Sequence, residues 1–278
     1  MTMYVPDSQP YQTKVLPTMY DLPSEDPEEP GLPDEFHDYQ PELLRITCRP
    51  ANHPLEQIFI ATDLNLYYDS NHLNWYKRPD WFVVLGASRF YIGDELRLSY
   101  VMWQENISPL VVVELLSPGT EDEDLGITPE ARNKPPTKWR VYEEILQIPY
   151  YFVFSRYTNQ LRVFQVIDNR YREQVLTDSR FWIPELELGI GLWEGNYQGF
   201  SRLWLRWYDA SGDWVLTPEE FERQRAELES QRAELESQRA ESESQRAELE
   251  SQRAESERQR ANRLAEILRE MGINPDEL

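Results

Sequence analysis

A single glutamate, Glu114, interrupts the apolar stretch LVVVELLSPG, and it is the first candidate for chemistry. The stretch is typical of a buried strand, in which side chains alternate between faces, so Val112, Glu114 and Leu116 would share one face. Burying an ionised carboxylate without a partner costs several kcal/mol. We therefore expect Glu114 to pair with a base, to be protonated or to bind a cation. The Ser-Pro-Gly that follows ends the strand, which places Glu114 near the carboxyl edge of a sheet, where open α/β sheets bind ligands.

Two further residues could share this site. Asp80 begins another apolar run, DWFVVL, at a position where there is no helix to cap. Lys138 lies at the expected first position of a helix, where a positive charge opposes the helix dipole at a cost of about 0.3–1 kcal/mol. An acidic partner is therefore expected beside Lys138.

An aspartate, a glutamate and a lysine that converge on one point can carry out metal-dependent hydrolysis of phosphodiester bonds. Asp80 and Glu114 would hold one or two Mg²⁺ (or Mn²⁺) ions, which polarise the phosphate and lower the pKa of a bound water. Lys138 would orient that water or neutralise developing charge. The basic segment 131–140 contains three residues that we expect to contact the nucleic acid backbone, namely Arg132, Lys134 and Arg140.

Each of these residues also has a structural interpretation. Glu114 could form a buried ion pair with Arg140 or another base. Asp80 could stabilise a turn next to proline, and Lys138 could be solvated near a helix end. Contiguous acids such as EDED at 121–124 more often form a solvated loop than a cation site. The three histidines, His37, His53 and His72, are scattered and lack zinc-site spacing.

The elements that must position these side chains are strands and helices in alternation. Runs rich in β-branched and aromatic residues predict strands at 80–85, 110–116, 150–155 and 161–167. Helix-like apolar spacing predicts helices over 53–68 and 138–147, the second with Thr137 as its N-cap. The pattern predicts a mixed α/β domain, with a central sheet flanked by helices.

Composition favours a domain with a core of its own. The 278 residues are 40% apolar and 13% aromatic, enough for one domain with appendages. One cysteine, Cys48, and no apolar run of membrane-spanning length predict a cytoplasmic protein without a membrane partner. The net charge of −22 argues against nucleic acid binding, but the charge is unevenly distributed. Residues 1–50 hold ten acidic and three basic residues, and residues 219–278 hold seventeen acidic and ten basic residues. Most of the negative charge therefore lies outside the central region.

Four segments can be distinguished from these patterns. Residues 1–40 are rich in proline and acid and predict a loosely ordered arm. Residues 41–218 form the domain, 219–272 a charged helix and 273–278 a tail. The helix repeats RAELESQ every seven residues, so its alanines return to nearly the same face. Leucine is present in only some of the repeats, which predicts a weak apolar surface for coiled-coil contact. We expect either weak self-association, giving a homodimer, or a solvated single helix.

The ordered motifs RPDWFVV, VVVELLSPGTEDEDLG, KWRVYEEILQIPYYFVFSRYTNQLRVF and LWLRWYDASGDWVLTPEE resemble the Uma-two family of restriction-endonuclease-like proteins, within the PD-(D/E)XK nuclease superfamily. The resemblance covers roughly residues 41 to 220. It implies a restriction-endonuclease-like mixed sheet with a divalent-metal site. By this resemblance Asp80 matches the aspartate of the PD element and Glu114 the acidic residue of the next strand. Leu116 stands where the usual lysine would be, and Lys138, four residues before Tyr142, matches the displaced lysine.

The resemblance also suggests further residues and a function. The superfamily often has a glutamate on its first helix, for which Glu56 is the nearest candidate. Asp124 is a family feature to which we assign a structural role. We expect a Mg²⁺-dependent DNA endonuclease, with RNA as a lesser alternative substrate. The other hypothesis is a catalytically silent module of nuclease fold that self-associates or captures a partner through its C-terminal helix.

Overall fold

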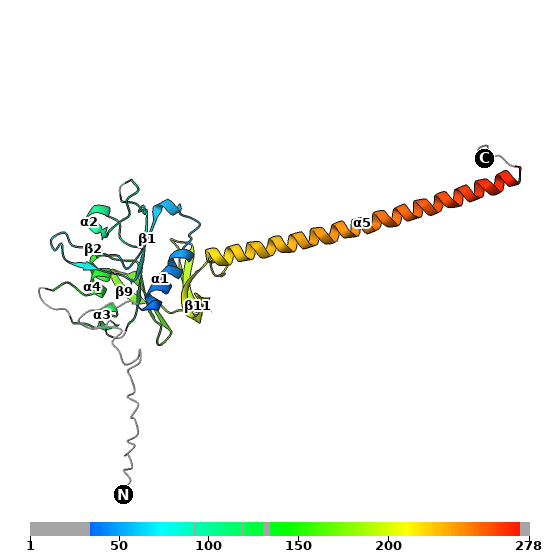
Figure 1. Ribbon diagram of the computed structural model, residues 1–278. Helices are drawn as coiled ribbons and strands as arrows, with labels where there is room; N and C mark the ends of the chain where they lie inside the picture. Colours follow the sequence, from blue (N-terminus) through cyan, green and yellow to red (C-terminus); the bar gives the residue numbers. More distant parts are fainter. Residues whose placement is uncertain (1–33, 92, 118, 120, 130–133, 273–278) are drawn as a thin grey trace, which may run out of the picture. The chain divides into compact units, whose positions relative to one another are not determined.

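The structure is a computed structural model that describes residues 34–91, 93–117, 119, 121–129 and 134–272. The chain divides into two compact units, Met1–Thr217 and Pro218–Leu278. The first unit contains three β-sheets with short helices around them, and the second contains the long helix α5 (Figure 1). This architecture confirms the predicted mixed α/β class and the long C-terminal helix.

The central sheet has six strands in the order β1, β4, β6, β7, β8, β9. Their bounds are Ile58–Thr62, Trp81–Leu85, Val111–Leu115, Tyr150–Ser155, Gln160–Ile167 and Arg170–Glu173. β6 and β7 are parallel, with Glu114 opposite Val153, and the other neighbours are antiparallel. The carboxyl ends of β6 and β7 therefore lie at the same edge of the sheet.

Alternate side chains of the strands lie on opposite faces of the sheet and pack into two separate hydrophobic clusters. Along β6, Val111 and Val113 join one cluster, whereas Val112 and Leu116 join the other. Glu114 lies on the same face as Val112 and Leu116, which confirms the predicted alternation. The carboxylate is thus directed into an apolar layer.

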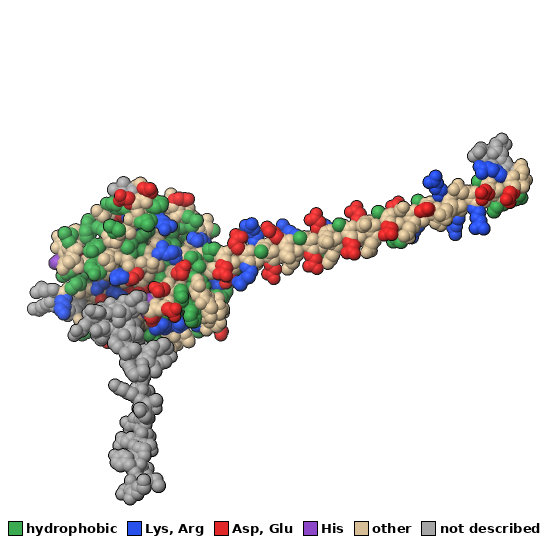
Figure 2. Space-filling model, in the orientation of Figure 1, with side chains coloured by type: hydrophobic (Ala, Val, Ile, Leu, Met, Phe, Trp, Pro, Cys, Tyr) green, Lys and Arg blue, Asp and Glu red, His purple; other side chains and the backbone are tan. Residues whose placement is uncertain are grey.

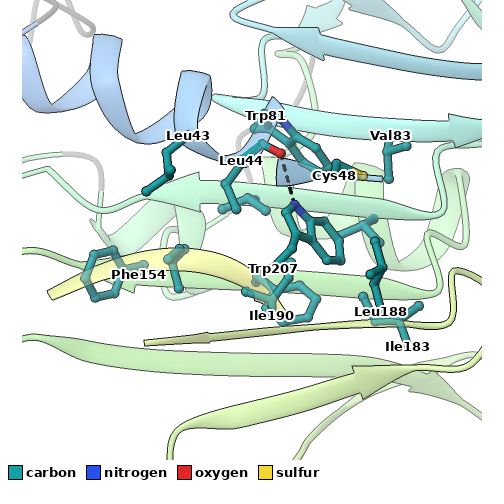
Figure 3. Packing of buried hydrophobic residues seen from close by; sticks show 14 of the residues in the cluster. Leu43, Leu44, Cys48, Trp81, Val83, Phe154, Ile183, Leu188, Ile190 and Trp207 are labelled. Carbon is teal, nitrogen blue, oxygen red and sulfur yellow. Dashed lines mark hydrogen bonds between the residues drawn. The ribbon is translucent and has the colours of Figure 1, made fainter. Parts of the chain in front are cut away.

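One face of the central sheet packs against α1 (Glu35–Thr47) and a second sheet, β10-β11-β12. The strands of this sheet are Arg180–Ile183, Leu188–Tyr197 and Phe200–Tyr208. Figure 3 shows Trp207 from β12 within this cluster, where its Nε1 donates a hydrogen bond of 3.1 Å to the Leu44 carbonyl. The buried tryptophans of this region, Trp204 and Trp207, therefore complete the core.

Helix α1 begins inside the segment predicted as a loosely ordered arm. Asp34 is its N-cap, and Phe36 and Gln40 are buried. The Gln40 amide pairs with the Leu205 backbone through two hydrogen bonds, of 2.9 Å to the carbonyl oxygen and 2.8 Å from the amide N–H. The expected boundary at residue 40 therefore falls too late, because aromatic and amide side chains anchor residues 35–40. The rest of that arm, 1–33, lies outside the described residues.

The opposite face packs against a small sheet and a helical segment after residue 137. The small sheet joins β3 (Tyr76–Lys77), β2 (Leu66–Tyr67) and β5 (Tyr100–Val101), followed by α2 (Met102–Glu105). The helical segment is a turn of α-helix, α4 (Lys138–Arg140), that continues as a π-helix, η2 (Val141–Ile145). The Thr137 hydroxyl accepts a hydrogen bond of 3.3 Å from the Arg140 N–H, which confirms the predicted N-cap.

The prediction of a helix over residues 53–68 is wrong. This segment forms a short 3₁₀ helix, η1 (Leu55–Gln57), and then strands β1 and β2. Ile58 packs into one cluster and Phe59 into the other. A strand buried on both faces carries apolar residues without the alternation that distinguishes it from a helix.

The second unit is built around α5 (Pro218–Glu270), 53 residues in which no residue is buried. Figure 2 shows acidic and basic side chains along the whole helix. Leu228, Leu235 and Leu249 are each more than half exposed. Among the described residues, no helix combines the length and the apolar character needed to cross a membrane.

Candidate functional site

The Glu114 carboxylate is fully buried, and both of its oxygens are hydrogen bonded. The Lys138 Nζ lies 3.0 Å from Oε2, and the Tyr142 hydroxyl donates to Oε1 at 2.8 Å. Lys138 and Tyr142 come from α4 and η2, which pack on the face of β6 that carries Glu114. The base that pairs with Glu114 is therefore Lys138, whereas Arg140 pairs with Glu144 at 3.1 Å.

A second buried carboxylate, Asp124, binds the same ammonium group. Its Oδ1 lies 2.9 Å from the Lys138 Nζ, and the residue is 1% exposed. Asp124 ends the short helix α3 (Glu121–Asp124), and its carbonyl accepts a hydrogen bond of 2.9 Å from the buried Tyr151 hydroxyl. The acidic run at 121–124 is therefore not simply a solvated loop, because its last member turns inward to Lys138.

Asp80 lies next to these groups, immediately before β4. Its Oδ2 accepts a hydrogen bond of 2.6 Å from the backbone N–H of Leu115, the residue after Glu114. The Asp80 charge acts on the pKa values of Glu114, Asp124 and Lys138. Asp80, Glu114 and Lys138, which lie far apart in sequence, are thus brought together at one place on the sheet.

The electrostatics of this cluster reflect a shortage of positive charge. Burial raises the pKa of Glu114 well above its usual value; the Lys138 charge lowers it, and Asp124 and Asp80 raise it further. Burial would lower the pKa of Lys138, but Asp124, Glu114 and Asp80 together raise it well above its usual value. Glu114 and Asp124 share the Lys138 ammonium group and the Asp80 charge acts on it from nearby, so the cluster has a net charge of −2 when every group is ionised.

Comparison with known proteins assigns this arrangement to a family. Residues 16–198 match the family model Uma2, described as "Putative restriction endonuclease". The chain belongs to the Uma2 family. The match spans Asp80, the strand that carries Glu114 and the helix that carries Lys138, and it confirms the resemblance inferred from the sequence motifs. A nuclease class for the core follows from this membership.

One solved structure similar to this Uma2 chain is a crystal structure of "a putative nuclease belonging to DUF820" from Anabaena variabilis. The two share 14% sequence identity with a TM-score of 0.35, and the alignment covers 56% of this chain and 76% of the other. The comparison with curated proteins finds no significant match.

The backbone that presents Lys138 in this Uma2 core is fixed by neighbouring charges and by a close glycine. The Glu123 carboxylate accepts hydrogen bonds from the Lys138 N–H at 3.3 Å and from the Lys77 Nζ at 2.8 Å. Gly126 has φ +71°, and a Cβ atom there would lie 2.7 Å from the Trp139 ring. The loop before α4 can therefore approach Trp139 only with glycine at this position.

A histidine that we regarded as scattered lies beside the Uma2 site. The Nδ1 of His37 is 2.9 Å from Asp34 Oδ1, and its Nε2 is 3.3 Å from the Leu115 carbonyl oxygen and 3.2 Å from Ser117 Oγ. Burial would lower the pKa of His37, but the hydrogen bond to Asp34 and the Asp80 and Asp34 charges raise it. No sequence spacing indicates this neighbourhood, because α1 and β6 are separated by more than sixty residues.

The remaining predicted residues of this Uma2 chain are Glu56, Lys134, Arg140 and Arg132. Glu56 is exposed in η1. The predicted helix that would have carried it is absent, and α1 is the first helix of the described chain. Lys134 is exposed, Arg140 is engaged with Glu144, and Arg132 lies outside the described residues.

Metal ligands were predicted at Asp80 and Glu114. Among the side chains that the structure describes, no three or more His, Cys, Asp or Glu residues are arranged as a metal-binding group. Asp80, Glu114 and Asp124 share Lys138 as their compensating charge instead.

Proposed function

We propose that this Uma2 protein is a divalent-metal-dependent endonuclease that hydrolyses DNA phosphodiester bonds at Asp80, Glu114 and Lys138. The observation that carries the proposal is the buried charge imbalance of the cluster. Glu114 and Asp124 are 0% and 1% exposed, Asp80 adds a third carboxylate, and Lys138 supplies the compensating charge. Buried carboxylates in excess of their counter-charges favour a bound cation.

The donor chemistry suits Mg²⁺ or Mn²⁺, which prefer carboxylate oxygens. When all three carboxylates are ionised, the net charge of −2 is what one divalent ion would neutralise, and such an ion would favour the ionised forms of Glu114 and Asp124. Asp80 and Glu114 would hold the ion, with Asp124 as a further oxygen donor nearby. When bound, such an ion polarises a phosphate oxygen and lowers the pKa of a coordinated water.

The protein's own side chains would complete the site. Lys138 can donate hydrogen bonds to a phosphate oxygen or to an attacking water, since an ammonium group has three donors. Tyr142 fixes the Glu114 carboxylate through its hydrogen bond of 2.8 Å. Arg132, Lys134 and Arg140 remain predicted contacts to the DNA backbone, and RNA remains the lesser alternative substrate.

Cleavage of supercoiled plasmid in the presence of Mg²⁺ or Mn²⁺ tests the proposal. We expect nicked and linear products from the wild type, and none from Asp80→Asn or Glu114→Gln at matched folded concentration. Asp168→Asn is the matched control, because that carboxylate is exposed in the turn between β8 and β9, at the edge of the sheet opposite the carboxyl ends of β6 and β7. Equal cutting by wild type and Asp80→Asn would exclude this active site.

Binding of the metal can be measured without cleavage. A cation that binds the folded state raises the melting temperature with concentration. We expect Mg²⁺ to stabilise the wild type more than Asp80→Asn. An identical response of the two proteins would remove Asp80 from the set of ligands.

A catalytically silent module is the second candidate, and one observation favours it. Lys138 already binds Glu114 and Asp124, and Tyr142 occupies the other Glu114 oxygen. A cluster closed in this way can act as a structural ion-pair network. This function predicts DNA binding or partner capture without cutting, and unchanged melting on addition of Mg²⁺.

Homodimer formation through α5 remains a prediction, as does a cytoplasmic location. Leu264 and Ile267 are exposed near the end of α5 and could form a contact between two copies. Light scattering on the full chain and on a chain ending at Thr217 tests this idea. A monomer in both cases would exclude it.

A further inference from the structure

A second group of charged side chains lies where the carboxyl ends of β6 and β7 meet the start of α1. Ser117 follows β6, Arg156 is the first residue after β7, and His37 is in the first turn of α1. His37 contacts the Leu115 carbonyl and Ser117, and its pKa responds to the Asp80 charge. This group is therefore adjacent to the Asp80 and Glu114 cluster without being part of it.

The environment of His37 favours the doubly protonated ring. Its Nδ1 faces the Asp34 carboxylate at 2.9 Å, so this nitrogen carries a proton. Its Nε2 faces the Leu115 carbonyl oxygen at 3.3 Å, which can only accept a hydrogen bond. Protonation at both nitrogens satisfies both acceptors and gives His37 a positive charge.

Two arginines lie close to this histidine. Arg156 forms an ion pair with Asp34, and its guanidinium lies 5.4 Å from the centre of the Phe36 ring. Arg202, from β12, lies 4.4 Å from the same ring, and its Nη2 donates to the Arg156 carbonyl at 3.4 Å. Phe36 therefore holds two guanidinium groups near each other.

These arginines have more donors and more charge than their surroundings satisfy. The Nε atoms of Arg156 and Arg202 are buried and have no hydrogen-bond acceptor among the described residues. Burial lowers the pKa of Arg202, and the Arg156 charge lowers it further. Asp34 pairs with His37 and Arg156 and its charge acts on Arg202, while the Asp80 charge also acts on His37, so three cationic side chains lie near two carboxylates. Like charges held together in this way are stabilised by an anion.

We propose that His37, Arg156 and Arg202 form a phosphate-binding site that receives a backbone phosphate of the nucleic acid beside Asp80. Guanidinium groups bind phosphate through paired, charge-assisted hydrogen bonds, and Phe36 limits their motion. Ser117 offers a hydroxyl at the same place. In the free protein Asp34 takes the position of the anion, so it competes with phosphate for Arg156. The inference rests on the proposed function only in naming nucleic acid as the ligand.

The test measures binding of a fluorescent DNA duplex by anisotropy across a range of salt concentrations, with metal chelated so that no cutting occurs. Arg156→Gln should weaken binding about tenfold or more and reduce the slope of log affinity against log salt by about 0.9, the value for one phosphate contact. Arg172→Gln is the matched control, because Arg172 is exposed on β9 and lies outside this group.

A second variant tests the same site by a gain in affinity, which misfolding cannot produce. Asp34→Asn keeps the N-cap of α1, since asparagine and aspartate cap helices equally well. It removes the competing carboxylate, so we expect tighter binding and a steeper dependence on salt. Plasmid cleavage by the same variants is measured in parallel.

The outcomes separate this inference from the proposed nuclease. Tighter binding by Asp34→Asn with weaker binding by Arg156→Gln supports the phosphate site, whether or not the protein cuts DNA. If the wild type cuts DNA but both variants bind like Arg172→Gln, the phosphate site is excluded and the nuclease stands. If the wild type binds no DNA, the inference fails as well.

Discussion

Replacement of Lys138 by methionine tests the buried cluster most directly. Methionine keeps much of the apolar stem and removes the charge. The Lys138 amine lies 3.0 Å from Glu114 Oε2 and 2.9 Å from Asp124 Oδ1, and these two residues are 0% and 1% exposed. Lys138→Met therefore leaves two buried carboxylates without the ion-pair partner they share.

The size of the effect depends on this burial. Removing one partner of a buried ion pair costs about 3–5 kcal/mol, and the upper end applies because two carboxylates lose the same partner. For a domain of about 150–250 residues, each kcal/mol lowers the melting temperature by roughly 2–4 °C. We therefore expect Lys138→Met to melt about 10–20 °C below the wild type near neutral pH.

The pH dependence provides a second readout. Without the ammonium group, the folded-state pKa values of Glu114 and Asp124 rise further above their ordinary values of 4.5 and 3.8. An acid with a raised folded pKa contributes stability that is fully present below its unfolded pKa and is lost as pH rises through the folded value. The melting deficit of Lys138→Met should therefore be small in mild acid and grow toward neutral pH.

The assay is thermal unfolding by circular dichroism at several pH values. Lys134→Met is the control, because Lys134 is an exposed lysine four residues upstream. A Lys138→Met protein that melts with the Lys134→Met control at every pH would refute the paired, buried placement of the amine. A large deficit that does not depend on pH would refute the assignment of its cause to the two carboxylates.

Three further outcomes are expected. Burial raises the pKa of the Cys48 thiol to about 12, so the native protein should resist alkylation in mildly alkaline buffer and react once unfolded. Mass spectrometry measures the labelling, and rapid labelling of the native protein would contradict the packing of α1. Because the pKa of His37 is raised above 6.5, its contribution to stability is present below that pH and lost as pH rises through the folded value. His37→Gln should therefore show a smaller change of melting temperature with pH than the wild type over that interval. If melting temperature depends on pH equally in the two proteins, the pairing of His37 with Asp34 does not contribute to stability. Gly126→Ala should lower the free energy of unfolding in denaturant by at least about 2 kcal/mol, because the positive φ adds backbone strain to the clash with Trp139. Gly199→Ala is the control, because it also has a positive φ but has open space around it and should show only the strain. Equal losses in the two variants would refute the close approach of Gly126 to Trp139.

The part of the site that could be predicted from the sequence depends on local rules. Alternation along a strand placed Glu114 on the face of Val112 and Leu116, and the N-cap predicted at Thr137 marked the helix that begins at Lys138. The cost of a buried charge then left three possibilities for Glu114, namely a basic partner, protonation or a bound cation, and the structure shows the basic partner Lys138. These steps need only the chain within a few residues of each side chain.

The remaining features depend on contacts between distant segments. The acidic run at 121–124 predicts a solvated loop, but Asp124 at its end is buried and pairs with Lys138, a contact that the run itself does not indicate. His37 lies beside Asp80 and Leu115 only because Phe36 and Gln40 dock α1 on the sheet. The segment 53–68 was misread because its residues are buried on both faces, which removes the periodicity that separates strand from helix.

The repeated sequence of α5 has a consequence for how this protein can vary. Each RAELESQ unit adds seven residues, or about 10 Å of helix, and rotates the remainder of the helix by only about 20°. Because no residue of α5 is buried, a unit can be gained or lost without leaving a cavity or a clash. Duplication or deletion of whole units would therefore change the length of the helix in nearly equal steps, while its last apolar residues keep almost the same rotational position.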